Sequence, residues 1–227
     1  MRFEGRSRTW LAAGLVWLAA AAAGAETLEL PELMAKFAAS RGVEAEFREE
    51  KSLPLLAEPL VAEGVFYFVP PDRMVRFTRV PEPASMLLDG NRLRIEDGLG
   101  VEEIDLGAEP TAKQLVSQLL VLLRGDLPAL ERDYRVALSG TSDGWLLDLA
   151  TKSSRMRPVL EGLALEGRAG RLDTMVLRGA NGETTRTRYT RVVTDRAFRE
   201  DELSRLFPAD GSPQALDPVA PTPAPGS

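Results

Sequence analysis

The chain of 227 residues contains no cysteine and no histidine. The first absence excludes disulfides, thiolate nucleophiles and lipidation of a cysteine, and the second excludes a Ser-His-Asp triad. Zinc, haem and iron–sulfur centres lose their usual imidazole and thiolate ligands as well. A hydrolase that uses carboxylates alone stays open as a class, but nothing in the sequence fixes two carboxylates facing each other across a cleft. We therefore expect no catalytic residue, no metal and no cofactor.

A surplus of positive charge is also missing. The 28 Lys and Arg residues are outnumbered by 34 Asp and Glu residues, which gives a net charge of -6. Proteins that bind nucleic acid carry a basic face, so nucleic acid is not an expected partner. The length suits one domain with a sizeable core.

Long apolar runs are absent except near the N-terminus. Three arginines among the first eight residues precede an apolar run of 14 residues, Trp10–Ala23, and small residues follow at Ala23-Gly24-Ala25. This order is typical of a cleavable secretory signal peptide. The run is short for a membrane anchor, because 14 helical residues span about 21 Å and a bilayer core needs about 30 Å. We predict a signal peptide over residues 1–25 and a mature protein in the periplasm.

Proline is concentrated at the other end of the chain. Six of the 20 residues from Pro208 to Ser227 are proline, and alanine, glycine and serine make up most of the rest. Such a composition cannot bury a core, so we predict a disordered tail over residues 208–227. The folded domain is then expected over residues 26–207.

Helix signals are sparse between these two ends. The apolar spacing over residues 30–37 predicts a first helix. A stronger helix is predicted over Thr111–Arg124, where Thr111 would cap the N-terminus and leucines form a stripe on one face. Short helices are expected at Leu127–Asp133 and Glu200–Leu206.

The rest of the domain alternates apolar and polar residues with a period of two, as antiparallel strands do. About ten such strands follow one another, with tight turns predicted at Asp89-Gly90, Asp143-Gly144 and Asn181-Gly182. We expect a mainly β (α+β) fold, in which an antiparallel meander wraps toward a barrel or half-barrel with few helices. The apolar helix over residues 111–124 would lie across the open sheet and close an apolar cavity. Ordinary core packing of that helix is the alternative.

Six segments of the sequence match a known family in order and spacing. They are Phe47–Lys51, Gly64–Pro71, Leu88–Leu93, Leu119–Asp126, Trp145–Leu149 and Gly182–Thr185. Together they resemble the LolA family, the periplasmic carriers of outer-membrane lipoproteins. The resemblance extends from about residue 30 to residue 195.

The resemblance implies a fold and a function. The fold would be an incomplete barrel with a helical lid over a hydrophobic cavity. The protein would accept acyl chains of a lipoprotein at the inner membrane and hand them to an outer-membrane acceptor, without catalysis or cofactor. Its partners would be the acylated lipoprotein or lipid, an inner-membrane release complex or transporter, and the acceptor, and we expect a monomer. A carrier of another lipid in a specialised export pathway and a lipoprotein-sensing envelope regulator are the alternatives.

Eleven apolar residues at strand or lid positions are predicted to line the acyl-chain cavity, with ordinary core packing as the alternative for each. They are Phe47, Phe66, Phe68, Phe77, Met86, Leu88, Leu115, Leu119, Leu122, Trp145 and Leu147. Members of the LolA family latch the lid through an arginine just before a strand-ending proline. Pro70 stands at that position here, so Arg73 or Arg76 is the candidate for a lid latch.

Overall fold

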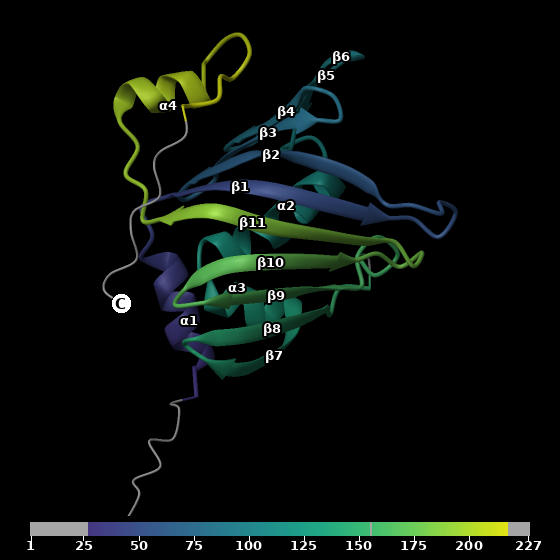
Figure 1. The fold of residues 1–227 in the computed structure, drawn as a ribbon, viewed down its shortest axis with the longest axis vertical. Coiled ribbons are helices and arrows are strands. Elements are labelled where there is room, and N and C mark those ends of the chain that lie inside the picture. Colours follow the sequence, from purple (N-terminus) through teal and green to yellow (C-terminus); the bar gives the residue numbers. More distant parts are fainter. Residues whose placement is uncertain (1–26, 155, 218–227) are drawn as a thin grey trace, which may run out of the picture.

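One antiparallel sheet of eleven strands forms the body of the molecule (Figure 1). The computed structural model describes residues 27–154 and 156–217, and the predicted signal peptide lies outside them. The strands are β1 (Val43–Ser52), β2 (Leu60–Val69), β3 (Arg73–Val80), β4 (Ala84–Asp89), β5 (Arg92–Asp97), β6 (Gly100–Asp105), β7 (Tyr134–Thr141), β8 (Gly144–Thr151), β9 (Gly162–Arg168), β10 (Arg171–Arg178) and β11 (Thr184–Thr194).

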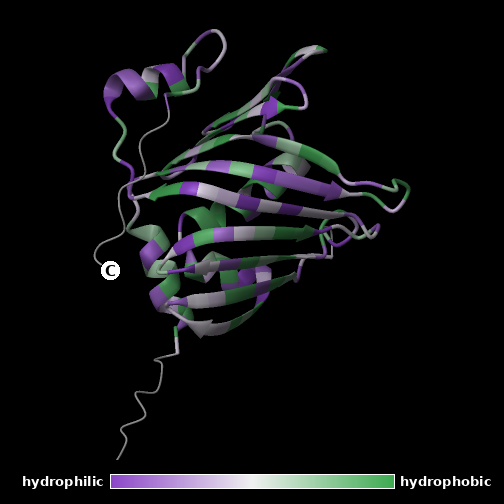
Figure 2. Ribbon diagram, in the orientation of Figure 1, coloured by the Kyte–Doolittle hydropathy of each residue, from purple (hydrophilic) through white to green (hydrophobic). Residues whose placement is uncertain are grey.

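The strand order is β6-β5-β4-β3-β2-β1-β11-β10-β9-β8-β7. The first and last strands of the chain therefore pair in the middle of the sheet, and neighbouring strands are joined by hairpins on either side. The sheet ends at β6 and β7 without closing on itself, so the incomplete barrel predicted from the sequence is confirmed. Hydrophilic and hydrophobic residues alternate along its strands (Figure 2), as a sheet with two different faces requires.

Four helices accompany the sheet in the described residues: α1 (Leu30–Ala38), α2 (Pro110–Leu123), α3 (Leu127–Asp133) and α4 (Glu200–Leu206). The bounds predicted for α3 and α4 are confirmed. The cap predicted for α2 is wrong, because Glu109 precedes the helix without a side-chain cap and Pro110 takes the first helical position. The side chain of Asp126 caps α3 by accepting a hydrogen bond from the backbone N–H of Ala129 at 3.1 Å.

The inner face of the sheet packs against α1, α2 and α3. In Figure 1, α2 and α3 lie behind the strands, and α1 lies beside the left-hand ends of the strands. One apolar cluster joins these helices to β7–β10, with Leu130, Leu147 and Leu149 fully buried. A second joins α2 to β2–β5 around Phe68 and Leu88. The apolar stripe of α2 is therefore buried, as its sequence requires.

The outer face carries a third apolar cluster over β2–β4. The chain leaves β11, forms α4, and places Leu206, Phe207 and Leu216 against Val65 and Tyr67. Burial of apolar side chains on both faces explains why β2 reads as a nearly continuous apolar run rather than an alternating one.

Residues 208–217 follow α4 and are held against this outer face by specific hydrogen bonds. Arg92 donates to the carbonyl oxygens of Pro208 and Ala209 at 2.7 and 2.9 Å. The hydroxyl of Tyr67 accepts from the N–H of Leu216 at 3.2 Å and donates to its carbonyl oxygen at 3.3 Å. The predicted disordered tail is therefore wrong for residues 208–217, because these hydrogen bonds and the burial of Leu216 fix a segment whose composition alone predicts disorder. Residues 218–227 lie outside the described residues.

Candidate functional site

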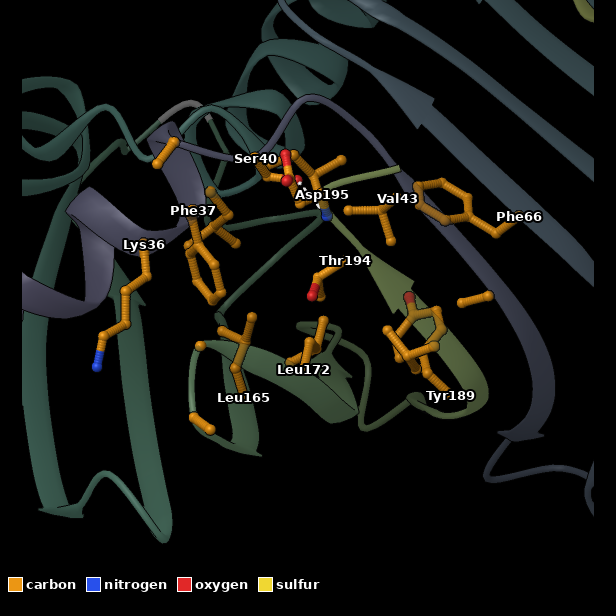
Figure 3. Close-up of a pocket in the computed structure, with 17 residues that line it drawn as sticks. Lys36, Phe37, Ser40, Val43, Phe66, Leu165, Leu172, Tyr189, Thr194 and Asp195 are labelled. Carbon is orange, nitrogen blue, oxygen red and sulfur yellow. Dashed lines mark hydrogen bonds between the residues drawn. The ribbon is translucent and has the colours of Figure 1, made fainter. Parts of the chain in front are cut away.

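A cavity of about 310 Å³ lies between the helices and the inner face of the sheet (Figure 3). Its apolar walls come from α1, α2 and five strands: Phe37, Val43, Ala45, Phe66, Leu122, Leu123, Leu165, Leu172, Tyr189 and Val192. In Figure 3, Phe37, Leu165 and Leu172 point toward the same space as Val43, Phe66 and Tyr189. At the end near α1 the lining also contains the polar residues Lys36, Ser40, Thr194 and Asp195.

A second space of about 90 Å³ adjoins the first and extends it along β1, from Val43 and Ala45 toward Phe47 and Glu49. Six residues line both spaces: Phe66, Leu122, Leu123, Leu165, Leu172 and Tyr189. Met74, Met86 and Met175 add flexible thioether side chains to the second space. We call the two spaces together the sheet cavity.

A separate group of charged and polar side chains lies in the wall of the second space. Arg76 of β3 donates two hydrogen bonds to the carboxylate of Glu49 on β1, at 2.8 and 3.1 Å. Thr187 lies opposite Glu49 on β11 and donates to the same carboxylate at 3.2 Å. We call Arg76, Glu49 and Thr187 the polar cluster.

A glycine makes this arrangement possible. Gly64 of β2 lies opposite Phe47 of β1, and a Cβ at Gly64 would come within 2.9 Å of the Phe47 ring. The ring occupies the space that the missing side chain leaves. The Arg76 guanidinium then stacks on that ring, 4.1 Å from its centroid, and reaches Glu49 across the intervening strand.

The end of the cavity near α1 is held by an ion pair. Asp195 accepts hydrogen bonds from the Arg41 guanidinium at 2.8 Å and from its backbone N–H at 3.1 Å. The guanidinium hydrogen bonds lower the pKa of Asp195 to about 2. Asp195 and Ala169, which also lines the cavity, have left-handed backbone angles, with φ of 57° and 49°. Strained backbone of this kind clusters at ligand-binding sites.

Five of the eleven predicted lining residues line the sheet cavity: Phe47, Phe66, Met86, Leu119 and Leu122. Four others lie in the cores beside it and line neither space: Phe68, Leu88, Trp145 and Leu147. These four residues are packed in the core, which was the alternative stated for each of them.

Two predicted lining residues lie away from the cavity, and their predictions are wrong. Phe77 packs on the outer face, where its ring centroid is 6.2 Å from that of Tyr67. The apolar residues on both faces of β2 and β3 hid this orientation from the sequence pattern. Leu115 of α2 is 44% exposed.

Several lining residues were missed from the sequence. Val43 and Ala45 precede Phe47 with the period of two, so the strand pattern contained the signal that would have found them. Phe37, Leu165 and Leu172 come together only in three dimensions, because α1 and the β9–β10 hairpin meet across the cavity.

Among the described residues, neither predicted latch arginine forms a hydrogen bond with α2. Arg73 forms an ion pair with Asp89 at 3.1 Å and lies over the Phe207 ring, and Arg76 belongs to the polar cluster. The hydrogen bond that joins α2 to the sheet comes instead from an arginine at the end of α2. Arg124, at the C-terminal end of α2, donates a hydrogen bond to the carbonyl oxygen of Pro71 in the β2–β3 turn.

Within residues 27–154 and 156–217, no group of acidic side chains is placed to hold a metal ion. No helix in the same residues has the length and apolarity needed to cross a membrane.

The profile of a family described as outer membrane lipoprotein carrier protein LolA-like matches residues 21–206. Because the match covers most of the chain, the protein belongs to this LolA-like family. The resemblance seen in the sequence is thereby confirmed. A comparison with curated proteins gives no significant match.

Several solved structures are similar to this chain. A LolA superfamily protein from Nitrosomonas europaea is 12% identical over 77% of this chain and 96% of its own, with a TM-score of 0.41. MucB in the MucA/MucB complex of Pseudomonas aeruginosa is 16% identical over 75% of this chain and 57% of its own, with a TM-score of 0.42. Lipoprotein LppX of Mycobacterium tuberculosis is 10% identical over 74% and 98%, with a TM-score of 0.41. Family membership rests on the profile match.

Proposed function

We propose that this protein is a periplasmic carrier that encloses an acyl chain of a lipoprotein or another lipid in the sheet cavity. It takes the chain from the inner membrane and releases it at the outer membrane, and no bond is made or broken. The sheet cavity supports this proposal most directly: apolar side chains from α1, α2 and five strands surround about 310 Å³, and about 90 Å³ adjoins it. Small-molecule sites have volumes of about 300–1,000 Å³ and mostly apolar walls.

The cavity volume limits the length of the acyl chain that can be enclosed. A methylene group is about as large as a water molecule, which occupies about 30 Å³, so the larger space holds roughly ten methylene groups. Removing ten methylene groups from water is worth about 8 kcal/mol. A bilayer offers an acyl chain the same apolar surroundings, so exchange between the membrane and the cavity is close to balanced. Both pickup and release are then feasible without an energy source at the cavity itself.

The helix α2 is the element that would have to move for a longer chain. Leu119, Leu122 and Leu123 of α2 cover the cavity, and the hydrogen bond from Arg124 to Pro71 holds the end of that helix on the sheet. The periplasmic location is inferred from the basic and apolar N-terminal sequence and from the family's description as a lipoprotein carrier.

A transfer assay tests the proposal. Donor vesicles carry a fluorescent acylated lipopeptide, acceptor vesicles carry a quencher, and the purified protein is added at increasing concentration. We expect the transfer rate to rise with protein concentration. Phe66→Glu should abolish the effect, because it places a charge in the cavity wall, whereas Thr190→Glu should not, because Thr190 is exposed.

Two results would count against a carrier. If transfer is not accelerated at any protein concentration, the proposal is wrong. If the lipopeptide binds tightly but is never released to acceptor vesicles, a lipoprotein-sensing regulator becomes the better description. Circular dichroism of both variants establishes that each is folded.

A further inference from the structure

The polar cluster is a feature that acyl-chain binding alone does not require. The side chains of Arg76 and Glu49 are only 26% and 19% exposed, and their neighbours in the cavity wall include Phe47, Met86 and Leu119. Removing an ion pair from water is costly, and apolar residues of similar size often serve stability equally well. An apolar wall would also suit an acyl chain better.

We infer that the polar cluster binds the carbonyl group that joins an acyl chain to the rest of its lipid, and that it disfavours a free fatty acid. This inference rests on the proposed function. The ligand chemistry is an uncharged ester or amide carbonyl, as found in glycerolipids and in acylated amino groups.

The first argument concerns donors. A guanidinium group has five N–H donors. Arg76 directs one from Nη1 and one from Nη2 to Glu49, and no acceptor for the other three is seen among the described residues. Stacking on Phe47 fixes the plane of the group. A carbonyl oxygen in the sheet cavity can accept one of these hydrogen bonds, and hydrogen bonds from a charged donor are stronger than neutral ones.

The second argument concerns charge. Glu49 already balances the positive charge of Arg76, and Thr187 donates to the same carboxylate. A fatty acid would bring a second carboxylate close to Glu49, and like charges in a site of low dielectric constant repel strongly. An ester or amide gains the hydrogen bond without adding a charge. Glu49 is therefore the residue that discriminates between the two classes.

The third argument concerns position. Glu49 lies at the end of the sheet cavity remote from Asp195, so a carbonyl bound there leaves the apolar space around Ala45 and Leu172 for the acyl chain. The sheet cavity then has polar groups at both ends: the polar cluster recognises the head of the chain, and the apolar space between the two ends accepts its tail.

The test compares three probes with the same pyrene-labelled acyl chain: the carboxylic acid, its methyl ester and its N-methyl amide. Binding is measured by fluorescence at a pH where the acid is ionised. In the wild type we expect the ester and the amide to bind at least tenfold more tightly than the acid. Preference for only one of the two carbonyl probes would assign the subsite to esters or to amides.

Glu49→Gln leaves the charge of Arg76 unbalanced, so the acid should bind at least tenfold more tightly than it does to the wild type. Glu50→Gln is the matched control, because Glu50 follows on the same strand and does not line the sheet cavity. It should leave all three affinities unchanged. Equal binding of the three probes to the wild type, with no change in Glu49→Gln, would overturn the inference and leave the proposed function standing.

A double variant covers the case in which Glu49→Gln does not fold. Arg76→Met with Glu49→Met removes the ion pair as a unit, and we expect the ester to bind about tenfold more weakly. Unchanged ester affinity with a lower Tm would mean that the polar cluster only joins the strands, which contradicts the inference. If no probe binds the folded wild type, the proposed function fails together with the subsite.

Discussion

Filling the sheet cavity should abolish acyl-chain binding without unfolding the protein. Ala45 is the position of choice, because it is buried on β1 and its small side chain lines the larger space between Val43 and Phe47. Ala45→Phe would project an aromatic ring into that space. Phenylalanine suits a strand, so the backbone of β1 is not expected to change.

The expected loss of affinity in Ala45→Phe can be estimated from the cavity volume. A benzene ring fills a cavity of about 150 Å³, which is roughly half of the 310 Å³ space. About five methylene groups of the ligand would then lose their place, at about 0.8 kcal/mol each. The loss is about 4 kcal/mol, which corresponds to a roughly thousandfold weaker affinity.

The assay is a fluorescence titration with a pyrene-labelled acyl ester, accompanied by a thermal melt. The matched control is Thr190→Phe, which adds the same ring next to Tyr189 but on the exposed side of β11. The control should bind the probe like the wild type. A folded Ala45→Phe variant whose affinity stays within threefold of the wild type would show that the acyl chain does not occupy the larger space.

Three further outcomes follow from the structure. Burial raises the pKa of all three tyrosines, Tyr67, Tyr134 and Tyr189. The ultraviolet absorbance of the folded protein should therefore show almost no tyrosinate at pH 10, the usual pKa of tyrosine. A tyrosine titration midpoint near pH 10 in the folded protein would contradict this packing. An NMR titration should give Asp195 a pKa of about 2, and this pKa should return toward 3.8 in Arg41→Met. Because the pKa is lower in the folded state, the ion pair stabilises the fold above pH 3.8, and this stabilisation is lost as the pH falls toward 2. Arg124→Ala removes the hydrogen bond to Pro71, so stopped-flow fluorescence should show several-fold faster entry and release of the acyl probe, and unchanged rates would mean that this contact does not hold α2 closed.

The sequence predicted the architecture because its signals are local. The Asp-Gly and Asn-Gly turns divide the chain into hairpins, and the end positions of α3 and α4 follow from short apolar patterns. Period-two alternation also placed Phe47 on the same face of β1 as Val43 and Ala45, and all three residues line the sheet cavity. A long antiparallel meander interrupted midway by the apolar helix α2 followed from these local elements, and its incomplete closure followed from the family resemblance.

The prediction failed where the outer face is buried as well. Residues 208–217 cover β2–β4, so apolar residues occupy both faces of these strands. The alternation of apolar and polar residues therefore does not indicate which face Phe77 occupies. The contacts that hold that segment are the burial of Leu216 and the hydrogen bonds from Arg92, and no composition rule singles out either of them. The polar cluster was also out of reach, because Arg76 and Glu49 meet only through the register of three strands and the space over Gly64.

The most direct test of the account is native mass spectrometry of the protein purified from a periplasm without detergent, followed by lipid extraction. The account predicts a bound species that contains an acyl chain linked through an ester or amide and that is absent from Ala45→Phe. A protein that carries no lipid in the wild type, and that also fails to take up the acyl ester probe afterwards, would contradict the claim that the sheet cavity is an acyl-chain site.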